Sequence, residues 1–151
     1  MFTLSYGLYV LTAGDASDNG CIIDAAAQVA SDPDRIAISV RKENFTREII
    51  EKTGKFNLSV LTEDAPFEVF KRFGMQSGRD VDKFKDFPAV KRSHNGLLYV
   101  TENTNAFISC KVVSQSDLGS HWLFVGEVTE SKVLSDKSSI TYAQYRKNLK
   151  K

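Results

Sequence analysis

The chain has 151 residues with a formal net charge of +1, and 26% of its residues are charged. This is an ordinary globular composition, and it predicts one domain over residues 1–151 with a sizeable core. The near-neutral charge argues against a nucleic-acid-binding protein, whose domains are usually strongly basic, and no apolar run approaches the roughly 20 residues that a membrane helix needs.

The cysteine content and the N-terminal sequence further narrow the class of protein. Cys21 and Cys110 are the only cysteines in the sequence, and they do not form a CxxC pair. This spacing indicates no metal site, and two reduced, buried thiols are the simplest interpretation. The opening apolar run is short and is interrupted by Gly14 and Asp15, which is not typical of a secretory leader. We therefore expect a soluble, cytoplasmic protein that binds neither nucleic acid nor membrane.

The first forty residues mostly show strand patterns. Residues 5–13 ("SYGLYVLTA") are rich in β-branched and aromatic residues and predict a first strand, and the dipeptide Asn19-Gly20 marks a turn. Residues 21–33 ("CIIDAAAQVASDP") are ambiguous, because the alanines suit a helix whereas the segment is short and ends in Asp-Pro. Residues 35–41 ("RIAISVR") are an apolar run of strand length.

Two short helices are predicted in the middle of the chain. The first begins at Thr46, whose hydroxyl can cap it, and ends near Gly54. Residues 55–62 ("KFNLSVLT") alternate as a strand does. Asp64 and Pro66 have the character of the cap and first turn of a second helix that Gly74 closes.

The rest of the chain is dominated by strands. After a polar loop over residues 75–88, strand patterns occupy residues 96–102, 105–115 and 121–134, and a terminal helix is predicted over residues 141–151. Strands outnumber helices and mostly follow one another directly. A mainly β fold results, and a closed or nearly closed antiparallel barrel with a few helices is the natural solution because closure removes exposed edges.

The start of the first helix carries an unusual charge pattern. Arg41, Lys42 and Arg47 gather at this end, although the partial positive charge of a helix N-terminus favours acidic residues there. Free helix amides, the Thr46 hydroxyl, the Asn44 side chain and nearby cations together suit a phosphate group. The alternative is an ordinary capping threonine among solvated charges that neighbouring glutamates balance.

A second candidate anion site lies in the polar loop. Ser77, Gly78, Arg79 and Lys83 could offer a hydroxyl, a backbone amide and two cations. A flexible, glycine-containing surface connection has the same composition, so both interpretations stay open from the residues alone.

Five segments, taken in order, show a family resemblance. They are "NGCIIDAAAQVASDP", "RKENFTREI", "FNLSVL", "FGMQSGRDVDKF" and "GSHWLFVGEV", and the match runs from about Tyr6 to about Leu134. In their order and spacing the chain resembles the flavin reductase-like proteins with the FMN-binding split-barrel fold. It looks most like the NADH:rubredoxin oxidoreductase domain of high-molecular-weight rubredoxins, in which a rubredoxin domain follows a tail similar to "TYAQYRKN".

The resemblance implies a fold and a set of partners. The fold is an FMN-binding split β-barrel, that is, a Greek-key antiparallel barrel with a few peripheral helices. The cofactor is a non-covalently bound FMN, with NADH or NADPH as hydride donor. The partners are a second copy of the chain in a homodimer, and rubredoxin or another electron-transfer protein as acceptor.

The resemblance also implies site residues. The FMN phosphate is expected near Arg41, Lys42, Asn44 and Thr46, and we add Ser77 and Lys83 of the polar loop. The flavin ring and ribityl chain are expected along Ile22, Ile23, Asp24, Ala25 and Gln28. His121 corresponds to a histidine that lies near the nicotinamide in many relatives, where an acid precedes it. Here Ser120 replaces that acid.

Three functions remain as hypotheses. The first is an enzyme that takes a hydride from NAD(P)H onto bound FMN and passes electrons to rubredoxin, free flavin or another acceptor such as ferric iron. The second is an FMN-bearing electron carrier that a protein partner reduces. The third is a flavin-binding protein without catalysis. The sequence contains no convincing nucleophile–base pair or carboxylate dyad, which suits hydride transfer because the cofactor supplies the chemistry.

Overall fold

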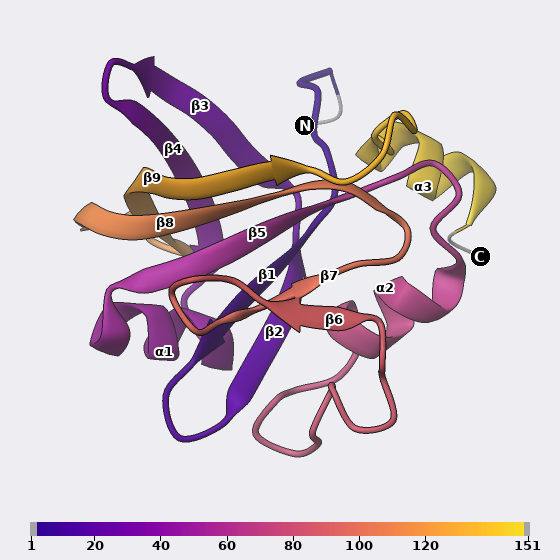
Figure 1. Cartoon of the computed structure of the whole chain (residues 1–151), viewed down its shortest axis with the longest axis horizontal. Coiled ribbons are helices and arrows are strands. Elements are labelled where there is room, and N and C mark those ends of the chain that lie inside the picture. The colour runs from indigo at the N-terminus through magenta and orange to yellow at the C-terminus, as the bar shows by residue number, and fades with distance from the viewer. Residues whose placement is uncertain (1–2, 150–151) are drawn as a thin grey trace.

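The computed structural model describes residues 3–149, which form a curled antiparallel sheet with three helices at its margins (Figure 1). The strands are β1 (Tyr9–Gly14), β2 (Asp18–Ile23), β3 (Ala25–Ser31), β4 (Asp34–Arg41), β5 (Lys55–Leu61), β6 (Val90–Arg92), β7 (Leu98–Val100), β8 (Thr104–Asp117) and β9 (His121–Val133). The helices are α1 (Phe45–Thr53), α2 (Phe67–Gly74) and α3 (Tyr142–Asn148). In the part of the chain that is described, no helix has the length and apolar character needed to cross a membrane.

The main sheet is curled so that its two edges meet at one residue. Its strand order is β2-β1-β5-β8-β9-β4-β3, and every pairing is antiparallel. The edge strands β2 and β3 are consecutive in the chain, and only Asp24 separates them. The edges therefore touch at Asp24 and diverge on either side of it. The two edge strands are joined through Asp24 but not paired with each other, so the barrel is split rather than closed, and the predicted split-barrel fold is confirmed.

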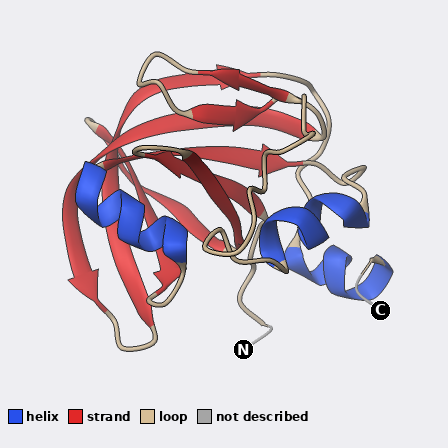
Figure 2. Cartoon of the chain, turned by 90° about the horizontal axis from the view of Figure 1, so that it is seen from below, coloured by secondary structure: helices blue, strands red, loops and turns tan. Residues whose placement is uncertain are grey.

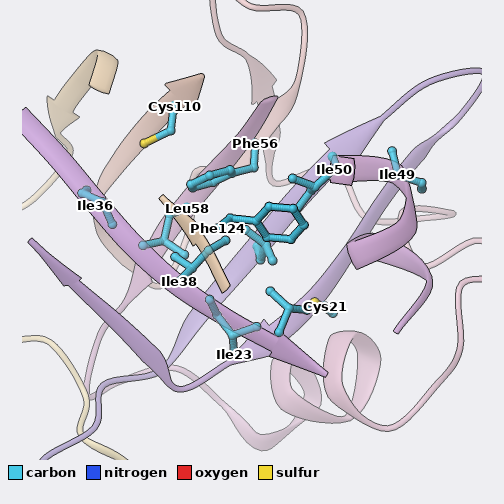
Figure 3. Close-up of a cluster of buried hydrophobic side chains, with 13 residues drawn as sticks. Cys21, Ile23, Ile36, Ile38, Ile49, Ile50, Phe56, Leu58, Cys110 and Phe124 are labelled. Atoms are coloured by element: carbon cyan, nitrogen blue, oxygen red, sulfur yellow. The ribbon is translucent and has the colours of Figure 1, made fainter. Parts of the chain in front are cut away.

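A compact apolar core fills the curl (Figure 3). Phe56, Phe124, Ile38 and Ile50 are completely buried and point into it from three strands and from α1. The close approach of β9 to this core requires Gly126, because a Cβ there would lie 2.6 Å from the Cβ of Cys110. A side chain at this position would have to displace the sheet.

A second apolar cluster joins α2 and α3 to the outside of the sheet. Figure 2 shows these two helices side by side near the C-terminus, whereas α1 lies against another part of the curl. The rings of Phe70 and Tyr145 stand 4.6 Å apart between α2 and α3. The cluster also includes Leu8, Leu61 and Ile140, so the helices are attached to the start of β1 and the end of β5.

Several local predictions are confirmed and others are wrong. The ambiguous residues 21–33 form the end of β2 and all of β3, because strand pairing overrides the helix preference of the alanines. The short strand β6 was not predicted. Gly54 ends α1 with a left-handed φ of 73°, as expected.

The predicted helix starts need correction. Asn44, not Thr46, is the N-cap of α1, and its side chain accepts a hydrogen bond from the Thr46 amide at 2.9 Å. Asp64 does not cap α2, which starts after Pro66 without a side-chain cap. The Asp64 carboxylate accepts a hydrogen bond from the Thr62 hydroxyl instead. In both cases the error is two residues in register, which propensity alone does not resolve.

The curled core predicts a large cost for removing its central ring. Phe124→Ala is expected to lower the free energy of unfolding by about 3–5 kcal/mol, because a fully buried ring leaves a cavity that the packed sheet cannot close. Urea denaturation followed by circular dichroism measures this. Val113→Ala on β8, where the side chain is 43% exposed, is the control and should change stability by less than about 0.5 kcal/mol. Equal effects of the two substitutions would contradict this account of the core.

Candidate functional site

A hollow of about 510 Å³ opens beside Asp24, where the two edges of the sheet meet. β2 and β4 form one wall, and the C-terminal part of α2 and the aromatic side chains of α3 form the other. The residues that line this hollow, here called the main cavity, are Leu8, Cys21, Ile22, Ile23, Asp24, Ser39, Val40, Arg41, Asn44, Phe70, Phe73, Gly74, Met75, Gln76, Lys83, His121, Tyr142 and Tyr145.

A polar annex of about 360 Å³ continues the main cavity toward the start of α1. The two hollows share lining residues from the 41–44 turn and from residues 74–83. The annex adds Glu43, Phe45, Ser77 and Gly78, and the Glu43 carboxylate is the one that accepts from Arg41. The combined space therefore has an apolar end below β2 and a polar end at α1.

The start of α1 presents fewer free groups than the sequence indicated. The Thr46 amide is already satisfied by Asn44, and the Thr46 side chain is completely buried, with its hydroxyl donating to Asn19 Oδ1 at 3.1 Å. Thr46 lines neither hollow, whereas Asn44 lines both.

The three cations near this helix end have different positions. Arg41 lines both hollows, and its guanidinium donates to Glu43 Oε1 at 2.8 Å. Lys42 turns away and forms an ion pair with Asp117 at 2.6 Å. Arg47 lies over the ring of Trp122 and lines neither hollow. Only Arg41 of the three therefore faces the hollows.

Lys83 is the buried charge of the site. It is 5% exposed, and its ammonium donates to the carbonyl oxygens of Gly20 at 2.8 Å and Phe73 at 2.9 Å. The Phe73 carbonyl belongs to the last turn of α2, where backbone oxygens lack helical partners and attract cations. Burial lowers the pKa of Lys83 below its ordinary value. Since an ammonium has three donors, one remains for a ligand in the hollows that Lys83 lines.

A close contact holds the loop that carries Ser77 and Lys83. Gly78 lies against the Asn19 side chain so tightly that a Cβ at this position would overlap the amide. The guanidinium of Arg79 covers the ring of Phe45 at 4.7 Å and pairs with Glu48. The loop is thus attached to both β2 and α1.

The predicted ring-side residues divide into two groups. Ile22, Ile23 and Asp24 line the main cavity, whereas Ala25 and Gln28 lie further along β3 and do not. The Gln28 amide donates instead to Asp34 Oδ1 at 3.1 Å.

Cys21, which precedes Ile22 on β2 and begins the segment expected along the flavin, also lines the main cavity. Its pKa is raised to about 11 by burial, with Lys83 acting in the opposite direction. The thiol is therefore neutral near pH 7 and is not an activated nucleophile. Cys21 and Cys110 are both free and buried, as predicted.

His121 stands at the rim of the main cavity. In the antiparallel pairing of β4 and β9 it lies directly opposite Arg41, and both residues line the cavity. Its Nδ1 lies 2.8 Å from the Ser120 hydroxyl, so the serine that replaces an acid still contacts the ring. Within residues 3–149, no group of three or more His, Cys, Asp or Glu side chains is placed to hold a metal ion.

The wall that α2 and α3 provide was not predicted from the sequence. Phe70, Phe73, Tyr142 and Tyr145 line the main cavity from these helices. Their aromatic spacing is typical of a core-facing helix, so nothing in the pattern distinguishes a cavity wall from ordinary core.

The chain matches a known family along nearly its whole length. The profile of the family described as "Flavin reductase like domain" matches residues 1–150. The chain therefore belongs to the flavin reductase-like domain family.

Two relatives are similar over most of the chain. A high molecular weight rubredoxin from Moorella thermoacetica is 39% identical over 147 residues, which are 96% of this chain and 63% of that protein. A ferric-chelate reductase (NAD(P)H) from Archaeoglobus fulgidus is 37% identical over 145 residues, which are 95% of this chain and 85% of that protein. The chain thus spans less than two thirds of the length of the rubredoxin relative.

Solved structures support the fold independently. An NADH:FAD oxidoreductase from Streptomyces globisporus has a TM-score of 0.85 at 20% identity, covering 93% of this chain and 83% of that one. An FMN-binding protein from Thermus thermophilus has a TM-score of 0.79 at 22% identity, and the match covers 87% of this chain and 72% of that one. At these identities the likeness supports the split-barrel fold and nothing finer.

Proposed function

We propose that the chain is an FMN-dependent oxidoreductase that takes a hydride from NADH or NADPH and passes electrons to rubredoxin, free flavin or another acceptor. One observation carries the proposal: in a flavin reductase-like domain, the split of the barrel opens into a cavity with a cationic polar end and an apolar end. The names of the two relatives, a rubredoxin and a ferric-chelate reductase, support the class of acceptor.

The residues present fit FMN. The volume of the main cavity, about 510 Å³, lies in the range of small-molecule sites. Lys83, Asn44, Ser77 and Arg41 would hold the phosphate at the polar end, where they supply ammonium, amide, hydroxyl and guanidinium donors. Thr46 and Lys42 would not contact the phosphate directly. Thr46 would support this end through its hydrogen bond to Asn19, and Lys42 through its place in the 41–44 turn.

The apolar end fits the flavin ring. Ile22 and Ile23 offer an apolar strand surface beside it, and Asp24 lies at the junction of the edges. Ala25 and Gln28 would be peripheral to this contact.

When bound, FMN would supply the hydride-accepting and electron-transfer chemistry, while the protein would supply orientation. His121, at the rim, would contact the nicotinamide donor. We further propose that residues 1–151 act as one domain in a homodimer. The exposed Val29 on the edge strand β3 supports an interface, because apolar edge strands in proteins are usually covered.

The proposal is tested by the anaerobic absorbance spectrum of the protein reconstituted with FMN, before and after stoichiometric NADH. The expected result is rapid bleaching of the flavin absorbance as the flavin is reduced. If FMN binds but neither NADH nor NADPH bleaches it, the electron-carrier hypothesis replaces the enzyme. If no FMN binds, both are wrong.

Lys83 predicts how FMN affinity depends on charge. Lys83→Met should weaken FMN binding by about 1.5–3 kcal/mol, the contribution of a hydrogen bond to a charged group. Because burial lowers the pKa of Lys83, wild-type affinity should also fall as pH rises toward the alkaline range, whereas the affinity of the variant should not. Fluorescence titration measures both.

The control for this experiment is Lys85→Met, an exposed lysine of the same loop. Urea unfolding of both apoproteins separates loss of the helix-end contacts of Lys83 from loss of phosphate binding. Equal FMN affinity of wild type and Lys83→Met would remove Lys83 from the phosphate site.

The position of His121 at the rim of the main cavity predicts that its removal weakens binding of the nicotinamide donor without weakening binding of FMN. His121→Ala should raise the KM for NADH about fivefold, equivalent to one hydrogen bond of about 1 kcal/mol, while the Kd for FMN stays the same. Steady-state kinetics and FMN titration supply the two numbers. His94→Ala, at an exposed turn, is the matched control. If neither quantity changes in His121→Ala, the role of this histidine is structural.

A further inference from the structure

A second hollow, of about 470 Å³, lies between the N-terminal segment and α3. No part of the proposed FMN site uses it. It is lined by Leu4, Ser5, Tyr6, Thr141, Tyr142, Ala143, Arg146 and Lys147, and we call it the α3 groove.

The α3 groove adjoins the main cavity through one shared side chain. Tyr142 lines both hollows. A ligand that occupies both spaces would therefore pass Tyr142 between its two halves. No other residue lines both, among those described.

The walls of the α3 groove are fixed by the fold. The Tyr142 amide donates to the Tyr6 carbonyl at 2.9 Å, and Gly7 forms an antiparallel bridge with Thr141. Thr141 and Gln144 form a complete capping box at the start of α3. The N-terminal segment and the helix are thus joined by backbone contacts rather than by loose side chains.

The chemistry of the α3 groove suits an anion that carries a flat ring. The Tyr6 and Tyr142 rings meet edge to face, with centroids 6.5 Å apart and planes at 74°, so the ring that contributes its edge has neither face covered by the other ring. Nucleobases stack on such faces regardless of identity. Arg146 and Lys147 add positive charge, and no described residue that lines the groove is acidic.

We propose that the α3 groove binds the adenosine diphosphate half of the reduced dinucleotide, while the nicotinamide half enters the main cavity past Tyr142. This inference rests on the proposed function, and it adds the place at which the donor is recognised. A concave aromatic and cationic hollow of this size fits a nucleotide better than it fits the flatter surface of a protein partner. No bond forms or breaks in the groove, since its role is binding.

The decisive comparison uses two donors that differ only in this half. NADH contains the adenylate moiety, whereas reduced nicotinamide mononucleotide lacks it. Lys147→Glu should raise the KM for NADH about tenfold, because it replaces attraction to a phosphate with repulsion. The KM for the mononucleotide should change less than about twofold, and the Kd for FMN should not change.

The matched control is Lys111→Glu. Lys111 is exposed and lines none of these hollows. It lies opposite Lys55 in the β5–β8 pairing, at the start of β5. The other end of β5, at Leu61, is the one that hydrogen-bonds to Leu8 and Ile140. An equal rise of both KM values in Lys147→Glu, or no rise in either, would overturn the inference.

A binding measurement keeps the inference testable apart from turnover. Calorimetric titration of the FMN-loaded wild type with ADP-ribose should show binding that Lys147→Glu weakens about tenfold and Lys111→Glu leaves unchanged. Absence of ADP-ribose binding would overturn the inference even if NADH reduces the flavin. Failure of both donors to bleach the wild-type flavin would instead overturn the proposed function. The ADP-ribose titration alone would then show whether the α3 groove binds a nucleotide.

Discussion

The direct succession of the two edge strands is the constraint on which the rest of the structure depends. Because β2 passes into β3 through Asp24 alone, the first and last strands of the sheet must approach each other. The sheet can satisfy this only by curling, and the curl encloses the core around Phe56 and Phe124. On either side of Asp24 the edges separate and leave backbone unpaired. The main cavity lies at this point, so the site is a consequence of incomplete closure rather than an addition to the fold.

The buried Lys83 has two roles, since it stabilises the packing of α2 against β2 and supplies positive charge to the site. A buried ammonium is costly unless it is hydrogen-bonded, and two backbone carbonyls offset part of that cost here. One carbonyl belongs to β2 and the other to the end of α2, so the same side chain fixes the helix against the strand. Burial still lowers the pKa of Lys83 below its ordinary value. An anion at the polar end of the cavity would offset more of that cost, which gives a physical reason for the residue to be buried and still reach the cavity.

The sequence predicted the class of fold and the region of the site, but not its three-dimensional lining. Alternating patterns were sufficient for most strands, and the spacing of the family segments was sufficient for the split barrel. Residues 21–33 could not be assigned from propensity, because their strand structure comes from hairpin pairing with the neighbouring strands β1 and β4, which outweighs the helix preference of the alanines. Thr46 and Asn44 show the same limit on a smaller scale. Both are capping residue types, and only the backbone geometry shows that Asn44 caps the helix while Thr46 turns inward to Asn19.

The weak signature of the site follows from how it is built. Gly78 matters because of what it lacks, since it lets the 75–83 loop approach Asn19. Phe70, Tyr142 and Tyr145 contribute aromatic surfaces, and other core residues of similar size would provide similar ones. A hydride-transfer enzyme needs positioned walls and a few donors more than it needs a catalytic acid or base. Such a site leaves little trace in residue identity. It becomes visible only when the sheet edges, the loop and the two helices are seen to meet around one space.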